Sequence, residues 1–231
     1  MSAKVQRLRV TFARGEEMKY ITHLDLMRFW ERALRRAGLP VAYSEGFTPH
    51  PQISLAAPLP VGTTSDAELM DVFLSERVAP KDFLARAAAQ LPAGVRLIAA
   101  HEVGPGLPAV QADVRAAEYE VDVPGIAPDD AARAARRFLE QERVPWQHRR
   151  EDEVREYDIR ALVHDLRATP CEGGVRLLMR LRSDNSGSGR PEQVVAALGL
   201  PPPLRVHRTR IELRNSSPAR AAWRRHGRFA G

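Results

Sequence analysis

The chain of 231 residues has little cysteine, few aromatic residues and no long apolar run. Its one cysteine, Cys171, excludes internal disulfide bonds and cannot hold a four-cysteine zinc site or an iron–sulfur cluster. The apolar runs fall far short of the roughly 20 residues that cross a bilayer, and the start of the chain lacks the apolar stretch of a signal peptide. These absences predict a cytoplasmic protein with no membrane association, no metal site and no cofactor of its own.

Aromatic residues make up only 6% of the chain. The first predicted strand, at residues 7–13, supplies Phe12 alone. Many RNA-binding sheets stack bases on exposed aromatic side chains of their central strands. We therefore expect any RNA contact to be made by arginine with phosphate groups.

Positive charge is concentrated at the end of the chain. The whole chain has 35 basic and 29 acidic residues. From residue 205 onward it has eight arginines and one acidic residue, Glu212, so the first 204 residues carry a net charge of −1. An arginine-rich terminus is typical of a chain that binds a polyanion, most simply RNA, although a merely solubilising tail is the alternative. The candidates within the last predicted strand are Arg205, Arg208 and Arg210.

Hydrophobic periodicity predicts the same order of elements twice. In the first half, Thr22 begins a helix that Gly38 and Pro40 end, and Pro80 opens a second helix. Between them, residues 41–47 and 52–60 are predicted to be extended or looped segments. In the second half, Pro128 opens a helix, and a strand pair is expected at residues 144–163. The remaining predicted strands lie at residues 7–13, 67–76, 95–103, 117–124, 175–182 and 204–214, and a last helix at 190–200.

This β-α-β-β-α-β order predicts an α+β protein of tandem ferredoxin-like domains, with antiparallel sheets and helices on one face. The expected boundaries are a first domain at 1–104, a linker at 105–116, a second domain at 117–214 and a basic, disordered tail at 215–231.

The first predicted helix is strongly two-sided. Its arginines fall on one side of a helical wheel, opposite Leu26, Trp30 and Leu34. This side is a candidate anion or phosphate surface, or else a solvated face partly neutralised by Asp25 and Glu31. The arginines are Arg28, Arg32, Arg35 and Arg36.

The segment after this helix has an unusual composition for a connection. Gly46 permits a positive φ, and two prolines restrain the chain on either side of His50. We interpret it as a rigid recognition loop beside the arginines, although His50 could instead only stiffen the turn. The loop residues are Ser44, Glu45, Gly46, Phe47, Pro49, His50, Pro51 and Ser54.

An enzyme is a second hypothesis. His23, His50, Asp25 and Glu45 supply groups for acid–base chemistry, either in metal-independent RNA processing or in a two-histidine, one-carboxylate metal site, but none shows a spacing such as HExxH. A third hypothesis is a purely protein-binding adaptor that docks through Phe47.

The run from Thr22 to Glu68 resembles the radical-SAM-linked protein family, a bacterial domain. Its pattern combines Ser/Thr-His-Leu-Asp, Ser-Glu-Gly-Phe, Pro-His-Pro and Leu-Pro-x-Gly-x-x-Ser, and the stretches at 157–160 and 190–191 also match. The matching positions in the run are His23, Asp25, Arg28, Arg32, Ser44, Glu45, Gly46, Phe47, Pro49, His50, Pro51, Ser54, Pro60, Gly62, Ser65 and Glu68.

Members of this family are fused to a radical SAM domain or encoded beside one, and this chain lacks the CxxxCxxC motif of the cluster. The resemblance therefore implies a separate partner of a radical SAM enzyme. Together with the arginines, it predicts a non-catalytic accessory protein that recognises RNA or a ribonucleoprotein.

Overall fold

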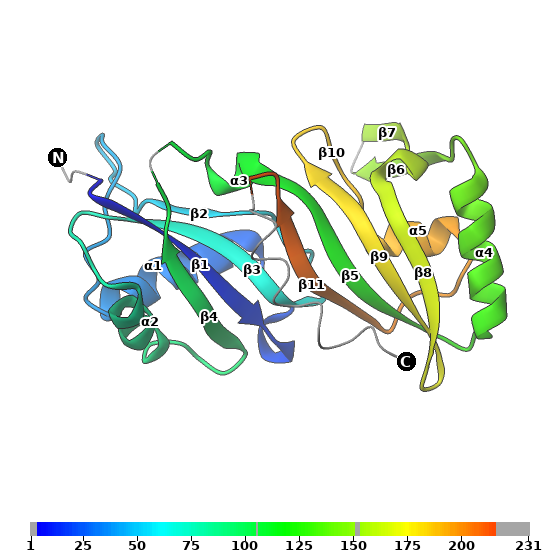
Figure 1. The fold of residues 1–231 in the computed structure, drawn as a ribbon, viewed down its shortest axis with the longest axis horizontal. Helices are drawn as coiled ribbons and strands as arrows, with labels where there is room; N and C mark the ends of the chain where they lie inside the picture. The colour runs from blue at the N-terminus through cyan, green and yellow to red at the C-terminus, as the bar shows by residue number, and fades with distance from the viewer. Residues whose placement is uncertain (1–3, 105, 151–152, 216–231) are drawn as a thin grey trace.

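The computed structural model describes residues 4–104, 106–150 and 153–215. Over these residues it has one nine-stranded mixed sheet, five α-helices and a separate two-stranded hairpin (Figure 1). The predicted α+β class is confirmed. Within the same ranges, no helix combines the length and apolar composition that crossing a bilayer requires.

The first half of the chain forms one end of the sheet. Its strands pair antiparallel in the order β4–β1–β3–β2. Helices α1 and α2 begin and end close to the predicted positions. The elements are β1 (Gln6–Arg14), a 3-10 turn (Glu16–Met18), α1 (His23–Arg36), β2 (Ile53–Leu55), β3 (Thr63–Leu74), α2 (Pro80–Ala88) and β4 (Val95–Glu102).

The second half repeats this strand order as β11–β5–β9–β8, again with antiparallel pairs. The short β10 extends the sheet beside β9. The elements are α3 (Val110–Asp113), β5 (Val114–Pro124), α4 (Pro128–Glu140), β6 (Pro145–Arg150), β7 (Glu153–Asp158), a 3-10 turn (Arg160–Leu162), β8 (Val163–Cys171), β9 (Gly174–Asp184), β10 (Gly187–Ser188), α5 (Pro191–Ala197) and β11 (Arg205–Leu213).

The two halves meet where β11 pairs with β3. This is the one parallel pairing of the sheet over the described residues, with Val206 opposite Thr63 and Arg208 opposite Ser65. Because β3 also pairs with β1, the strands of both halves belong to a single sheet.

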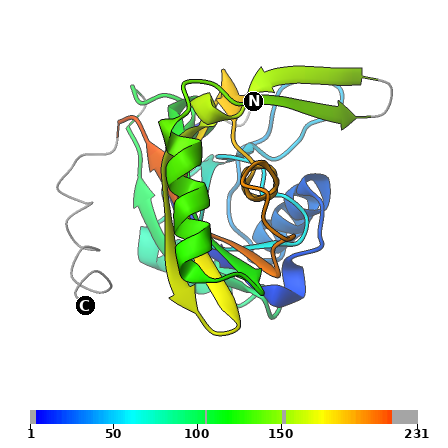
Figure 2. The same cartoon turned by 90° about the vertical axis from the view of Figure 1, so that its right-hand side faces the viewer.

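Two parts of the second half differ from the prediction. The predicted strand pair is present, but β6 and β7 form a hairpin of their own that projects beyond the main sheet (Figure 2). The strand that pairs with β9 is instead β8, which the pattern did not predict. A register shift between Val163 and Asp165 breaks its period-two alternation, and Pro170 lies near its end.

Within the predicted linker, residues 106–116 contain α3, and β5 begins at Val114. The guanidinium of Arg7 donates hydrogen bonds to the carbonyl oxygens of Leu107 (2.9 Å) and Pro108 (2.5 Å), which fastens this segment to β1. Of the predicted tail, only Asn215 lies within the described residues.

Apolar side chains form one large core cluster in each half. In the first half, Trp30 of α1 and Phe83 of α2 pack against strand residues such as Phe12. In the second, Phe138 of α4 and Val194 of α5 pack against β5, β8 and β9. Each fully buried side chain of this size contributes about 1.5–3 kcal/mol by leaving water.

Two buried ion-pair groups hold the central strands together. The guanidinium of Arg208 on β11 binds Glu68 on β3 at 2.8 and 2.5 Å, and both side chains are almost fully buried. The carboxylate of Asp71 on β3 accepts hydrogen bonds from both Arg7 and Arg9 on β1. Arg9 also lies 3.6 Å from Asp113 of α3.

Replacing Glu68 by glutamine is expected to destabilise the fold strongly. It leaves the charge of Arg208 buried without a counter-ion, which costs about 3–5 kcal/mol. The measurement is the free energy of unfolding in urea. As a control, Glu102→Gln weakens the exposed pair with Arg77 and is expected to cost less than about 1 kcal/mol. Equal costs for the two substitutions would show that the buried pair has no special role.

Candidate functional site

The first wall of the candidate site is helix α1. The hydroxyl of Thr22 accepts a hydrogen bond from the Asp25 amide (3.2 Å) and donates one to the Asp25 carboxylate (2.7 Å), which starts the helix as predicted. Gly38, with φ +62°, follows the helix end. Because Leu26, Trp30 and Leu34 are buried, the helix presents its arginines outward.

These arginines are largely free of acidic partners. Arg28 lies 3.7 Å from Asp25 across an exposed, loose pair. Arg32 and Arg36 donate to the backbone oxygens of Arg28 and Gln90, each at 3.2 Å. Across the part of the chain that the structure describes, neither Arg32 nor Arg35 forms an ion pair. Their positive charge is therefore available to a ligand.

The second wall is the recognition loop, residues 44–54. Tyr43 and Pro51 pair at its base, the Ser44 amide donates to the His50 carbonyl (2.9 Å), and the His50 amide donates to Ser44 Oγ (2.9 Å). Gly46 adopts φ +117°, and Phe47 at the tip is fully exposed. The loop is closed by its own hydrogen bonds between Ser44 and His50.

The loop and the helix line one pocket of about 380 Å³. This is within the usual range of small-ligand sites, roughly 300–1,000 Å³. The arginine pocket is lined by Arg28, Glu31, Arg32, Arg35, Tyr43, Pro49, His50 and Pro51. The structure thus brings the predicted arginine surface and recognition loop together.

Other predicted residues lie outside this lining. His23 is the first residue of α1 and half-buried, whereas His50 faces the arginines farther along the helix. Asp25 is engaged with Thr22, Glu45 is exposed, and Ser54 lies in β2 opposite Asp71. Within the described ranges, no three His, Cys, Asp or Glu side chains are arranged to hold a metal ion.

The arginines of β11 have a different environment from those of α1. Arg208 is 1% exposed and is bound to Glu68, so it is not available to a ligand. Arg205 lies 3.5 Å from Asp122 and 3.8 Å from Glu120. Arg210 lies 3.5 Å from Glu118. All three are neutralised by carboxylates of neighbouring strands.

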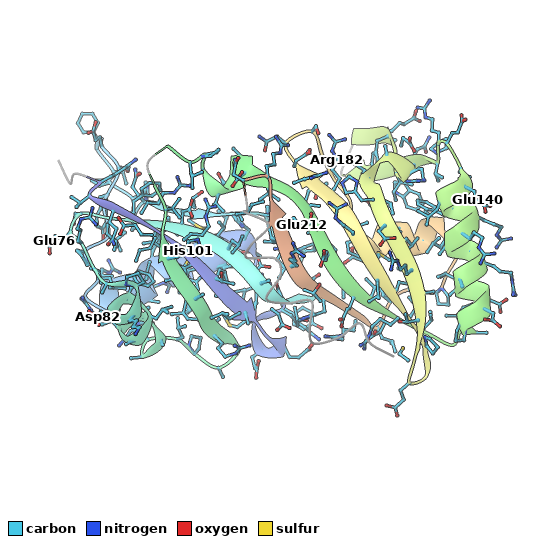
Figure 3. All side chains as sticks on the ribbon, viewed as in Figure 1. Glu76, Asp82, His101, Glu140, Arg182 and Glu212 are labelled. Atoms are coloured by element: carbon cyan, nitrogen blue, oxygen red, sulfur yellow. The ribbon has the colours of Figure 1, made fainter. Side chains whose placement is uncertain are left out.

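The pairs of Arg205 and Arg210 belong to a network of charged side chains on β5, β9 and β11 that also contains Arg176, Arg180 and Glu212. Glu212 is labelled in Figure 3. Two hydrogen bonds from Arg180, both 2.8 Å, lower the pKa of Glu212 to about 2. Hydrogen bonds from Arg176 likewise lower the pKa of Asp122. Burial, together with a hydrogen bond to Glu212, raises the pKa of Glu118.

Sequence reasoning missed some of the site. Tyr43 was not recognised as part of the pocket, although it directly precedes the loop motif. Glu31 was noted only as a neutralising acid. A further cluster was also missed, in which His207 forms a hydrogen bond with Thr64 Oγ1 (2.7 Å) and its Nε2 lies 3.2 Å from the Asp66 carboxylate. No sequence signal links these residues, because the pairing of β11 with β3 alone brings them together.

Comparison with known proteins gives a family. The model described as "Uncharacterized protein conserved in bacteria (DUF2344)" matches residues 7–191, so this chain belongs to that family. A comparison with curated proteins finds no match.

Some solved structures are similar over most of the chain. One is a crystal structure of a Cbf5–Nop10–Gar1 complex (TM-score 0.47, 12% identity, 90% of this chain). Another is the archaeal box H/ACA sRNP Nop10–Cbf5 complex (TM-score 0.42, 12% identity, 90% of this chain). This chain spans about half the length of each, 49%. A protein from Galdieria sulphuraria described as unknown has a TM-score of 0.26 (16% identity, 84% of this chain and 89% of that one). Similarities with TM-scores below 0.5 do not establish function.

Replacing Ser44 by alanine is expected to loosen the recognition loop without unfolding the protein. The substitution removes the acceptor of the His50 amide, a hydrogen bond worth about 0.5–1.5 kcal/mol. Hydrogen exchange of the His50 backbone amide should become faster. Ser54→Ala, in the same segment, serves as a control that leaves this exchange rate unchanged. Unchanged exchange at His50 in the Ser44 variant would contradict a loop held by this bond.

The network of charged side chains on β5, β9 and β11 predicts that the fold loses stability in acid. The pKa of Glu212 is lowered on folding, so its contribution to stability is present above its unfolded pKa, near 4.5, and is lost as the pH falls toward about 2. Arg180→Gln removes the main cause and is expected to flatten this part of the stability curve, measured by urea unfolding at several pH values. Arg167→Gln, at an exposed pair, is expected to leave the curve unchanged. Parallel curves of unfolding free energy against acidic pH for wild type and Arg180→Gln would refute the role of Arg180 in lowering the pKa of Glu212.

Proposed function

We propose that this protein recognises RNA through the arginine pocket and acts as an accessory module rather than as the catalyst. The observation that carries the proposal is that Arg28, Arg32 and Arg35 share one pocket with His50, while two of these arginines have no acidic partner in the described part of the chain. Guanidinium groups bind phosphate oxygens through pairs of parallel hydrogen bonds.

A preformed pocket favours recognition because the protein does not have to order a loop when the ligand binds. The closing hydrogen bonds of Ser44 and His50 support this state. The composition of residues 216–231, with four arginines and no acidic residue, supports a polyanionic ligand. The arginines of β11 do not add to this surface, since they are paired with carboxylates.

The partner in this proposal is a radical SAM enzyme. The resemblance of residues 22–68 to the radical-SAM-linked family supports it. A single cysteine cannot ligate an iron–sulfur cluster, so the cluster and its chemistry would belong to the partner. The fully exposed Phe47 at the loop tip offers an apolar contact for such a partner.

We further propose that the sheet consists of two ferredoxin-like units, residues 1–104 and 117–214, joined edge to edge. The matching strand orders β4–β1–β3–β2 and β11–β5–β9–β8 support this description. In this arrangement the arginine pocket belongs wholly to the first unit.

The test is binding of single-stranded RNA across a salt series, measured by fluorescence anisotropy. Three phosphate contacts predict a slope of log K against log salt of about −2. Arg32→Glu is expected to weaken binding roughly tenfold or more and to flatten the slope. Arg136→Glu is the matched control, since Arg136 is also an exposed helical arginine, on α4.

Absent or salt-insensitive binding would refute RNA recognition. An equal loss in the Arg136 variant would show that the effect is only one of net charge. Turnover of the RNA that disappears in His50→Ala would contradict the non-catalytic role.

A further inference from the structure

The arginine pocket has a specific charge balance. Its lining contains three arginines and one acid, Glu31, so its net charge is +2 before His50 is counted. Arg28 is the only one of these arginines with an acidic partner in the described ranges, and that contact, to Asp25, is long and exposed. The pocket thus presents two unpaired guanidinium groups and one loosely paired group within a single small volume.

This balance fits a phosphate monoester better than a phosphate within a chain. A monoester carries a charge of about −1.5 to −2 at neutral pH and has three free acceptor oxygens. A phosphate linking two nucleotides carries one negative charge. A phosphate monoester therefore balances the charge of +2 in a pocket with three guanidinium groups. A phosphate linking two nucleotides would leave excess positive charge in it.

The pocket also has an aromatic wall. Tyr43 lines the pocket, is 39% exposed, and its backbone pairs with Pro51 at the base of the recognition loop. A partly exposed aromatic ring beside a phosphate site is suited to stacking with a base, and such stacking tolerates any base. Glu31, also in the lining, is an acceptor for sugar hydroxyl or base amino groups.

We infer that the arginine pocket binds a phosphate monoester together with its adjoining base, as found at a phosphorylated end of single-stranded RNA. This inference rests on the proposed RNA recognition and specifies which part of the RNA enters the pocket. Arg28, Arg32 and Arg35 hold the phosphate, Tyr43 stacks on the terminal base, and Glu31 accepts a hydrogen bond from the sugar or base.

The experiment compares short RNAs of one sequence that carry a 5′-phosphate, a 3′-phosphate or hydroxyl groups at both ends. Anisotropy at fixed salt measures affinity for the full chain. One of the phosphorylated RNAs is expected to bind at least about tenfold more tightly than the hydroxyl form. Arg32→Glu is expected to abolish this preference, whereas Arg136→Glu retains it.

Two further variants isolate the aromatic wall. Tyr43→Leu is expected to reduce affinity for the preferred RNA by about fivefold or more, and Tyr43→Phe is expected to retain it, because the ring and not the hydroxyl stacks. Since Tyr43→Phe preserves the size of the side chain, a loss in that variant too would overturn the stacking role. Thermal unfolding of each variant confirms that it is folded.

A competition experiment shows whether the ligand is an RNA end or a free nucleotide or phosphate. Adenosine monophosphate and inorganic phosphate are added to the complex with the preferred RNA. Weak competition by both supports an RNA end as the ligand. Equal affinity for the nucleotide and the RNA would overturn RNA as the source and would refute the proposed function. Equal affinity for phosphorylated and hydroxyl RNAs, with dependence on Arg32 retained, would overturn this inference and leave RNA recognition standing.

Discussion

The buried pair between Arg208 and Glu68 is the interaction on which the joined sheet depends. It ties β11 to β3, next to a parallel pairing that contains only three register pairs. Arg208 also donates to the backbone oxygens of Ala57 and Pro58, so it fixes the proline-rich segment that follows the recognition loop. Burial acts to lower the pKa of Arg208, but the charge of Glu68 and the other interactions with Glu68 and Tyr119 together outweigh it, so the pKa is raised and the guanidinium remains charged. One residue therefore joins the two halves and restrains the segment leaving the loop.

Arginine has two separate roles in this protein, and the presence or absence of a neighbouring carboxylate decides which role each arginine has. On the sheet, each arginine of β11 faces a carboxylate from a neighbouring strand, so its charge contributes to the structure. On α1, the arginines have few acidic neighbours, and Arg28, Arg32 and Arg35 share a pocket with His50. Because a charge that is already paired gains little from a new ligand, only the second group suits anion binding. Local sequence composition does not distinguish these roles, since both groups look equally basic.

The elements with regular periodicity were predicted well. Thr22 and Gly38 marked the ends of α1, and alternation marked β1 and β9, because these signals act between near neighbours. The strand β8 was missed because a register shift interrupts its alternation, and the β6–β7 hairpin was assigned to the main sheet in its place. For the candidate site, the arginine face and the proline-restrained loop were both predicted, together with their proximity. Tyr43 and the pairing of the β11 arginines were not.

The sequence by itself determined the α+β class, the main helices with their caps, the two-sided character of α1 and the restrained loop around His50. These features depend on residues a few positions apart, whose steric and hydrogen-bonding preferences act locally. Only the tertiary structure decided that both halves share one sheet, that Arg208 is buried against Glu68, and that His50 rather than His23 faces the arginines. These features join positions up to 143 residues apart, and such contacts form only when the strands pair and the apolar cores close.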